Sequence, residues 1–275
     1  MGGINVGGSG KTPVATEIAR ILKKNRKTYC FLTKGYGGTA KGVKKLGAYS
    51  NDVYIVGDEA LLLFEHGDTF ISKNRVAGLK YINDNHKYDY IIMDDGLQNP
   101  TFHKDINILV IDGEYGFGNG LVIPAGPLRE SFSSANRNII NLVIIIGEDR
   151  QNISSLCNKY SLPVIYGKIE PTTKNFDKKY IAFCGIGHPE KFRKTLVDND
   201  VAIVDFIIFD DHHIYNNSNV DDLKKLGYPM ITTKKDWVKI KSLNIDKTNI
   251  HVLEIRIDFD NVAAVENVLL ANKSL

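Results

Sequence analysis

One short stretch near the start of the chain decides its fold: Val6-Gly7-Gly8-Ser9-Gly10-Lys11-Thr12, followed by Pro13. It matches most of the phosphate-binding pattern G-x-x-x-x-G-K-[ST], with Asn5 in place of the first glycine. In such a loop, backbone N–H groups surround phosphate oxygens, the lysine neutralises phosphate charge and the threonine hydroxyl can hold Mg²⁺. A glycine-rich turn that happens to precede Lys-Thr is the alternative. We predict that the nucleotide phosphates are bound by Gly7, Gly8, Ser9, Gly10, Lys11 and Thr12.

The residues on either side of this loop bear on the same prediction. Val14, Ile18, Ile21 and Leu22 recur at helical spacing, and a helix that starts at the loop aims its free N–H groups at the phosphate. Only the segment 1–6 precedes the first loop glycine. The strand that feeds the loop is therefore very short, or its start lies upstream of this sequence.

Length and composition set the broad class of protein. A chain of 275 residues accommodates one large or two ordinary domains, and 43% hydrophobic with 24% charged residues is typical of a soluble globular protein. The net charge of +3 is too small to indicate a nucleic-acid partner. Three cysteines without a C-x-x-C pair fit a reducing cytosol. The longest apolar run, 142–146, is too short to span a bilayer, and the start does not resemble a signal peptide.

Lysines cluster at 23–27, 41–45 and 234–241. Such clusters are typical of solvated faces, and a surface for anionic lipid is the alternative.

Predicted strands and helices alternate along the chain, which favours an α/β fold with mostly parallel sheets. Strands are predicted at 28–33, 88–94, 106–112, 141–146, 180–184, 201–209, 229–232 and 250–257. Further helices are predicted at 58–65, 73–84, 151–159, 190–197, 219–226, 234–242 and 260–271. We expect a P-loop NTPase-like α/β/α sandwich at 1–169, a polar linker at 170–179 and a second, smaller α/β domain at 180–275.

A second chemical element is Tyr90-Ile91-Ile92-Met93-Asp94-Asp95-Gly96. A buried strand that ends in acidic residues beside a phosphate-binding loop can hold Mg²⁺ or its waters against the phosphates. We predict that Asp94 is the metal ligand and that Asp95 assists it or faces the phosphate acceptor. A plain Asp-Gly turn after a strand is the alternative.

Further motifs occur in the same order as those of a known family. They are Gly7-Gly8-Ser9-Gly10-Lys11-Thr12-Pro13, Lys34-Gly35-Tyr36-Gly37, Gly57-Asp58-Glu59-Ala60-Leu61-Leu62-Leu63, Asp94-Asp95-Gly96-Leu97-Gln98, Gly118-Asn119-Gly120, Pro124-Ala125-Gly126-Pro127-Leu128-Arg129-Glu130, Gly185-Ile186-Gly187, Asp211-His212-His213 and Thr233-x-Lys235-Asp236. Over nearly the whole chain, the sequence resembles tetraacyldisaccharide 4'-kinase, the lipid A 4'-kinase.

The resemblance implies a reaction, a fold and a location. The family transfers the γ-phosphate of ATP, with Mg²⁺, to the 4'-hydroxyl of a tetraacylated glucosamine disaccharide 1-phosphate and so forms lipid IVA. Its fold has two α/β/α domains with the active site in the cleft between them. The lipid substrate lies in the inner membrane. We therefore expect the protein to be cytoplasmic and to bind peripherally at the cytoplasmic face of that membrane.

The resemblance also implies roles for individual residues. Asp58 matches the base that receives the proton of the sugar hydroxyl, and His212 matches its partner from the second domain. Asp58 also has the position of a helix N-cap, and His213 is a rival for the role of His212. Lys11 and Arg129 are expected to offset charge on the transferred phosphoryl group, although Arg129 could instead form a surface ion pair with its neighbour Glu130. Further substrate contacts are expected from Glu59, Arg75, Gln98 and Tyr36.

The sequence departs from the family at a few positions. Lys34, Asn99 and Lys234 stand where the family commonly has arginine, histidine and an acidic residue. The hydrophobic N-terminal helix with which family members usually dock on the membrane is absent from this sequence. A mis-called start and a truncated gene are both compatible with that difference.

A function of another class is also compatible with one motif. Thr233-Lys234-Lys235-Asp236 resembles the guanine-binding [NT]-K-x-D of P-loop GTPases, which would make the chain a nucleotide-driven switch. That class needs Asp-x-x-Gly at the metal strand, and Asp94-Asp95-Gly96-Leu97 does not supply it in that register. An inactive relic of the kinase is a third hypothesis.

Overall fold

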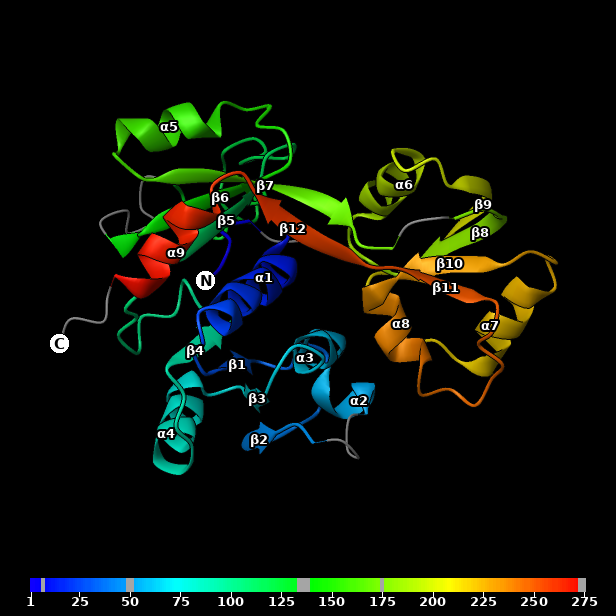
Figure 1. Cartoon of the computed structure of the whole chain (residues 1–275), viewed down its shortest axis with the longest axis horizontal. Helices are drawn as coiled ribbons and strands as arrows, with labels where there is room; N and C mark the ends of the chain where they lie inside the picture. The colour runs from blue at the N-terminus through cyan, green and yellow to red at the C-terminus, as the bar shows by residue number, and fades with distance from the viewer. Residues whose placement is uncertain (6–7, 48–51, 133–138, 174–175, 272–275) are drawn as a thin grey trace.

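The computed structural model describes residues 1–5, 8–47, 52–132, 139–173 and 176–271, and its chain forms two lobes (Figure 1). The first lobe contains two four-stranded sheets and the second lobe contains one. The strands of the first lobe are β1 (Tyr29–Thr33), β2 (Val43–Lys45), β3 (Thr69–Ser72), β4 (Tyr90–Met93), β5 (Ile108–Asp112), β6 (Leu142–Ile146), β7 (Val164–Pro171) and β12 (Ile255–Phe259). The strands of the second lobe are β8 (Lys179–Cys184), β9 (Ala202–Ile208), β10 (Met230–Thr233) and β11 (Ile250–Leu253).

Helices connect most of these strands. The first lobe has α1 (Lys11–Lys24), α2 (Val53–Val56), α3 (Asp58–Phe64), α4 (Arg75–Asn85), α5 (Ile153–Lys159) and α9 (Val262–Leu270). The second lobe has α6 (Pro189–Val197), α7 (Asn217–Lys224) and α8 (Lys234–Ile240). In the part of the chain that the structure describes, no helix combines the length and the apolar character needed to cross a membrane.

The sheets of the first lobe have the strand orders β2-β3-β1-β4 and β12-β7-β6-β5, and the start of the chain lies between them. The backbone N–H of Gly2 donates to Ile108 and its carbonyl accepts from Val110, both on β5. On the other side, the nitrogen of Met1 donates to the carbonyl of Met93, the last residue of β4. The short strand expected before the phosphate loop therefore exists in reduced form, as a bridge that joins the two sheets.

The unbroken apolar run of β6 is explained by cover on both faces of its sheet. Leu142, Ile144 and Ile146 face a core that α1 and α9 complete, whereas Val143 and Ile145 face a core that α5 completes. Buried parallel strands lose the polar alternation of a half-exposed strand for this reason. The first lobe is thus the α/β/α sandwich that the sequence predicts (Figure 1).

The second lobe is a smaller version of the same layering. Its four strands are all parallel, in the order β11-β10-β8-β9. Phe192 and Leu196 of α6 pack on one face, and Val220 and Leu223 of α7 pack on the other together with Ile240 of α8.

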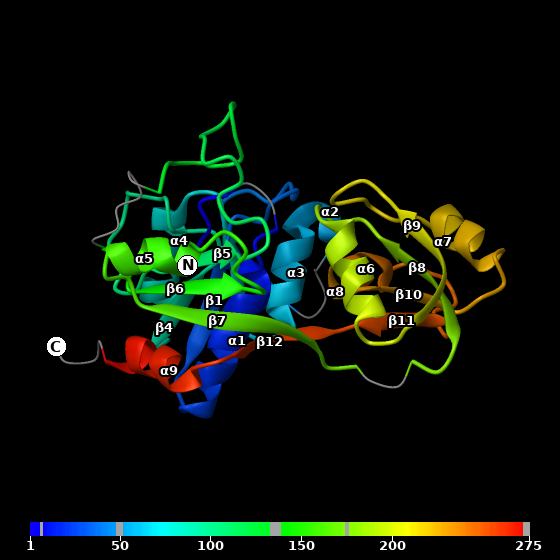
Figure 2. The same cartoon turned by 90° about the horizontal axis from the view of Figure 1, so that it is seen from above.

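The boundary predicted for the second domain, 180–275, is wrong at its C-terminal end. The predicted strand 250–257 is two strands: β11 ends at Leu253 in the second lobe, and β12 pairs antiparallel with β7 in the first. Figure 2 shows β7 and β12 running side by side from one lobe to the other. The helix α9 then packs on the core around α1. Apolar periodicity could not reveal this return, because it does not say which sheet a strand joins.

Four elements were missed by the sequence analysis, namely β2, α2, β3 and β7. Three of them have only three or four residues, too few for a periodic pattern to be recognised.

The return of the chain to the first lobe predicts the effect of a mutation in β12. Phe259 is buried in the core around α1, so Phe259→Ala should lower the free energy of unfolding by about 3–5 kcal/mol. Ile255→Ala, at a half-exposed position of the same strand, should cost less than about 1 kcal/mol. Urea unfolding followed by circular dichroism measures both. The single tryptophan, Trp237, packs in the second lobe and reports on the unfolding of that lobe. If Phe259→Ala lowered the stability measured by Trp237 fluorescence but not that measured by circular dichroism, the placement of β12 in the first lobe would be contradicted.

Candidate active site

The phosphate loop lies where α1 meets the carboxyl ends of the central strands. Gly8, Ser9 and Gly10 lead directly into α1, and Ser9 is buried. Gly10 has a φ of 79°, and an added Cβ there would meet the side chain of Ile146 at 3.4 Å, so glycine suits this turn. The Nζ of Lys11 lies 3.4 Å from the Oγ of Ser9. Gly7 lies outside the described residues.

Asp94 follows β4 and lies directly beside the phosphate loop. The Thr12 hydroxyl donates to Oδ2 of Asp94 at 3.1 Å. The other carboxylate oxygen, Oδ1, is buried and has no hydrogen-bond partner among the described residues. Burial raises the pKa of Asp94, the nearby charge of Lys11 opposes this, and Asp95 adds to it. A buried carboxylate with one oxygen left over is suited to an additional positive ligand.

Asp95 brings the two predicted cations together. Nη1 of Arg129 donates to both carboxylate oxygens of Asp95, at 2.9 and 2.8 Å, and Nζ of Lys11 lies 4.0 Å from Oδ1 of the same carboxylate. Asp95 has a φ of 51°, in the left-handed region. The surface pair considered between Arg129 and Glu130 is therefore not the contact that the structure shows. Lys11 and Arg129 converge on one point beside the phosphate loop.

The Asp58 carboxylate and the His212 imidazole meet across the two lobes. Asp58 is the first residue of α3 and is buried, and His212 lies on the loop after β9. Nδ1 of His212 lies 2.9 Å from Oδ2 of Asp58 and 3.2 Å from Oδ1. His213 points elsewhere: its Nε2 lies 3.2 Å from Asn219, and its ring stacks on Phe209.

The pairing shifts the pKa values of both groups. Burial alone would raise the pKa of Asp58, but the hydrogen bond from His212 and the nearby Lys235 and Lys239 outweigh it, so that the pKa is lowered. The hydrogen bond to Asp58 raises the pKa of His212, and partial burial and Lys235 oppose that rise. The charged form of each partner is thus stabilised by the other.

Two lysines of α8 lie close to this pair, and the sequence analysis gave neither of them a role in phosphoryl transfer. Nζ of Lys235 lies 3.3 Å from Nε2 of His212 and 3.8 Å from Oδ2 of Asp58. Lys239, one turn further, is buried and forms an ion pair of 2.8 Å with Asp236. Their i, i+4 spacing after a capping threonine was the available signal.

The remaining predicted substrate residues lie at different depths. The Tyr36 ring is largely exposed and has its centroid 5.1 Å from that of His212. Burial raises the pKa of Glu59, and so does the charge of Asp94. Arg75 is buried beneath the site and donates to the Asp94 carbonyl at 2.8 Å. Gln98 donates to the Gly3 carbonyl at 2.8 Å, so it supports the segment before the phosphate loop.

A second contact between the lobes was not predicted. Asp112 at the end of β5 forms an ion pair with Lys191 of α6, and burial lowers the pKa of that lysine to about 8. Nearby, the rings of Tyr115 and His188 stack with centroids 4.9 Å apart. An added Cβ at Gly8 would meet His188 at 3.3 Å, so the second lobe touches the phosphate loop itself. The position of Asp112, at the carboxyl end of a buried strand as for Asp94, was the signal available in the sequence.

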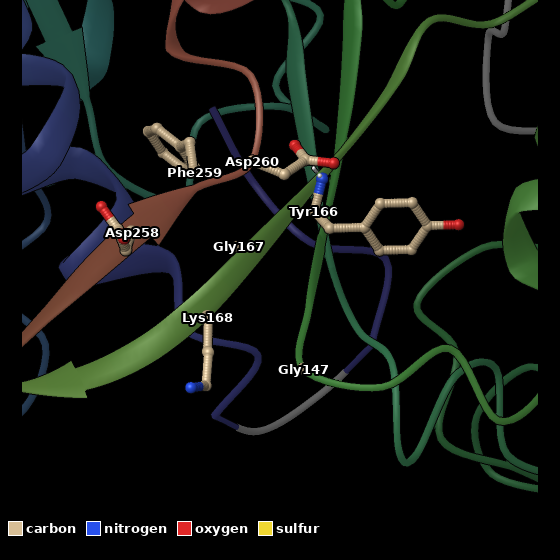
Figure 3. A pocket seen from close by; sticks show the side chains of 7 residues that line it. All are labelled: Gly147, Tyr166, Gly167, Lys168, Asp258, Phe259 and Asp260. Carbon is tan, nitrogen blue, oxygen red and sulfur yellow. Dashed lines mark hydrogen bonds between the residues drawn. The ribbon is translucent and has the colours of Figure 1, made fainter.

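Two hollows lie near the phosphate loop. One, of about 120 Å³, is lined by Asn5, Gly8, Ser9, Asp112, Tyr115, Gly118, Pro127 and His188. The other, of about 220 Å³, is lined by Gly147, Tyr166, Gly167, Lys168, Asp258, Phe259 and Asp260 (Figure 3). The second begins at Gly147, directly after the Ile146 side chain that lies against Gly10. Neither hollow is lined by Asp58 or His212.

Comparison with known proteins agrees with this arrangement. The sequence model of the family described as tetraacyldisaccharide-1-P 4'-kinase matches residues 1–273. This chain belongs to the tetraacyldisaccharide 4'-kinase family. It is 37% identical over 268 residues to a tetraacyldisaccharide 4'-kinase of Rickettsia canadensis, covering 95% of this chain and 80% of the relative. It is 34% identical over 279 residues to that of Rhodospirillum rubrum, covering 98% and 83%.

A solved structure has the same fold. It is a crystal structure of LpxK from Aquifex aeolicus, described as an "apo" form in complex with ATP, and it superposes with a TM-score of 0.79 at 24% identity. The superposition covers 98% of this chain and 86% of the other. The predicted fold class, a P-loop-type α/β/α sandwich with a second α/β lobe, is therefore confirmed, and so is membership of the tetraacyldisaccharide 4'-kinase family.

The Asp58–His212 pair predicts a dependence of stability on pH. The pKa of Asp58 is lowered on folding, so its contribution is present above the unfolded pKa of about 3.9 and is lost as pH falls through the folded value. The pKa of His212 is raised, so its contribution is complete below about pH 6.5 and is lost as pH rises through the folded value.

His212→Gln, which keeps a neutral donor, should therefore destabilise the protein most between about pH 4 and pH 6.5, by roughly 1.5–3 kcal/mol. Urea unfolding of both proteins at several pH values, followed by Trp237 fluorescence, tests this window. A difference that does not depend on pH would show that the imidazole is not charged in this pair.

Proposed function

We propose that this chain transfers the γ-phosphate of ATP to the 4'-hydroxyl of a tetraacylated glucosamine disaccharide 1-phosphate, giving lipid IVA. One observation carries the proposal. The loop after β8 touches both parts of the site: His188 lies 3.3 Å from an added Cβ at Gly8 of the phosphate loop, and Asp211, the neighbour of His212, lies 3.1 Å from an added Cβ at Gly187. A base for the acceptor hydroxyl and a phosphate site thus adjoin each other, as a kinase requires.

The phosphate side of the site belongs to the first lobe. Gly8, Ser9 and Gly10 offer backbone N–H groups at the start of α1, and Lys11 offers a charge. Arg129 lies against the same carboxylate as Lys11, so both cations are in place to offset negative charge on the transferred phosphoryl group. Asp95 holds these two cations in position and neutralises part of their charge until the phosphates bind.

The residues beside the loop fit a magnesium ion. Thr12 and Asp94 would hold it, because their oxygens are adjacent and Oδ1 of Asp94 is buried without a hydrogen-bond partner among the described residues. When bound, Mg²⁺ offsets the charge of the β- and γ-phosphates. The buried Arg75 fixes the backbone of Asp94 from behind, so we assign it to the support of this ligand.

The acceptor side is completed by the second lobe. The 4'-hydroxyl oxygen forms a bond to the γ-phosphorus while the bond from that phosphorus to ADP breaks, and the hydroxyl proton passes to Asp58. Its lowered pKa makes Asp58 a weak base that is always ionised near neutral pH. A weak base suffices in a loose phosphoryl-transfer transition state, because the hydroxyl loses its proton late. His212 orients the carboxylate and shares the proton that it takes up.

Substrate chemistry also leads us to propose a location. An acceptor with four acyl chains resides in a lipid surface, so we propose that the enzyme works at the cytoplasmic face of the inner membrane as a peripheral protein. Glu59 and Tyr36, which border the Asp58–His212 pair, are proposed to contact the sugar of this acceptor.

An assay of ADP release tests the proposed function. Purified protein is supplied with ATP or GTP and Mg²⁺, each with and without the tetraacylated disaccharide 1-phosphate. We expect release that requires both ATP and the lipid, and mass spectrometry should detect one added phosphate on the lipid. Lys11→Ala should abolish it with little change in the thermal unfolding temperature, because Lys11 stabilises charge on the phosphates and its described contacts with Ser9 and Asp95 are long, at 3.4 and 4.0 Å. Nucleotide hydrolysis without lipid would favour a switch, and inactivity would favour a relic.

A double-mutant cycle tests the base. Asp58→Ala and His212→Ala should each lower kcat by roughly 10²–10⁴-fold with little change in KM for ATP, since both act on the acceptor hydroxyl. Because they act as one unit, the double variant should be little worse than the worse single variant. His213→Ala should remain near normal, because its ring packs on Phe209 and bonds to Asn219. If the fold-loss of kcat in the double variant equalled the product of the two single losses, Asp58 and His212 would act independently, and the proposed pair would be contradicted.

A further inference from the structure

We propose that Lys235 holds His212 in the tautomer with its proton on Nδ1, so that the ring donates to Asp58. Lys235 is then a positioning residue that acts through the imidazole. The consequence for turnover rests on the proposed kinase function, whereas the tautomer itself does not.

The contact of Lys235 with the ring decides where the proton lies. Nζ of Lys235 is 3.3 Å from Nε2 of His212. An ammonium group has three donors and no acceptor, so Nε2 must present its lone pair to it. In a neutral imidazole the proton then lies on Nδ1, which is the nitrogen 2.9 Å from the Asp58 carboxylate. Both ring nitrogens have matching partners only in this arrangement.

The opposite tautomer would have no satisfactory partners. A proton on Nε2 would point at the Lys235 ammonium, and the other acidic group near that nitrogen, Asp211, is 3.9 Å away and beyond hydrogen-bond reach. The lone pair of Nδ1 would then face the Asp58 carboxylate at 2.9 Å, acceptor against acceptor. The nearby groups therefore select one tautomer strongly.

The neighbouring lysine on the same helix cannot do this. Lys239 is held by Asp236 at 2.8 Å, and its Nζ reaches only to within 4.0 Å of Asp58. Lys235 owes its position to the first turn of α8, which Thr233 caps by accepting from the N–H of Asp236 at 3.1 Å. Asp236 in turn accepts from the N–H of Gly185 at 3.1 Å, which ties this turn to the sheet of the second lobe.

A fixed cation beside Nε2 also bears on how the pair takes up a proton. Among the described residues, the charged and polar groups in contact with the ring are Asp58 on α3, Lys235 on α8, Asp211 on the same loop and Tyr36 after β1. Lys235 also lies 3.7 Å from Asp211, and Glu59, next to Asp58, interacts electrostatically with the ring. Asp58 favours a second proton on the ring, and Lys235 opposes it by like charge. Lys235 thereby keeps the pair able to accept the proton of the hydroxyl at lower pH than it otherwise could.

Nitrogen NMR tests the tautomer without substrate. The whole chain is labelled with ¹⁵N-histidine, and the His212 signals are assigned by their absence in His212→Gln. We expect the protonated signal on Nδ1 and the unprotonated one on Nε2 near neutral pH. In Lys235→Met the Nδ1 preference should weaken, and Lys235→Arg should restore it. A wild-type spectrum with the proton on Nε2 would overturn the proposal, whether or not the enzyme phosphorylates lipid.

The pH profile of kcat distinguishes this role from a structural one. Removing the Lys235 charge raises the proton affinity of the pair, so the acid limb of Lys235→Met should move to higher pH by roughly one unit, with KM for ATP unchanged. Lys235→Arg should move it back. Lys225→Met removes the same charge from an exposed surface pair of the second lobe and should leave the limb in place. If kcat of Lys235→Met fell by the same factor at every pH and the acid limb did not move, the proposal would be contradicted.

Discussion

The buried carboxylate of Asp58 is the constraint on which the arrangement of the two lobes depends. A carboxylate taken out of water is costly unless positive charge and hydrogen bonds replace its hydration. The first lobe supplies only the N–H of Glu59 at 2.8 Å among the hydrogen bonds described for it. The compensating groups, His212 and Lys235, come from the second lobe. The acceptor side of the site is therefore complete only where the lobes meet.

The same logic repeats on the other side of the phosphate loop. Asp112 is the last residue of β5, and Asp94 directly follows β4, so both carboxylates lie at the carboxyl end of a parallel strand. Lys191 of the second lobe pairs with Asp112, as His212 pairs with Asp58. Asp94 differs, because no group of the second lobe satisfies its free oxygen in the described structure. That difference agrees with the magnesium-ligand role proposed for Asp94, whereas Asp58 and Asp112 each also join the two lobes.

How far the sequence predicts this protein depends on how local each signal is. The phosphate loop, α1 and the strand ending in Asp94 depend on nearby residues, and the sequence located all three. Asp58 and His212 were found only through the family resemblance, because 154 positions separate them and no spacing rule joins them. The same resemblance contained Lys235 in a motif, but the role of that lysine follows from a distance to one ring nitrogen, which no sequence pattern encodes.

The return of the chain at Glu254 illustrates the same limit for the fold. The run 250–257 alternates apolar and polar residues in two phases, 250 and 252 followed by 253, 255 and 257, and it was predicted as one strand. In the structure Leu253 is buried in the second lobe and Ile257 in the first, so one short apolar run serves two separate cores. With β7 beside it, this segment gives the second lobe two covalent connections to the first. A lobe attached at both ends has far less freedom than one on a single linker, and that restriction helps His212 and Lys235 return to Asp58 in one orientation.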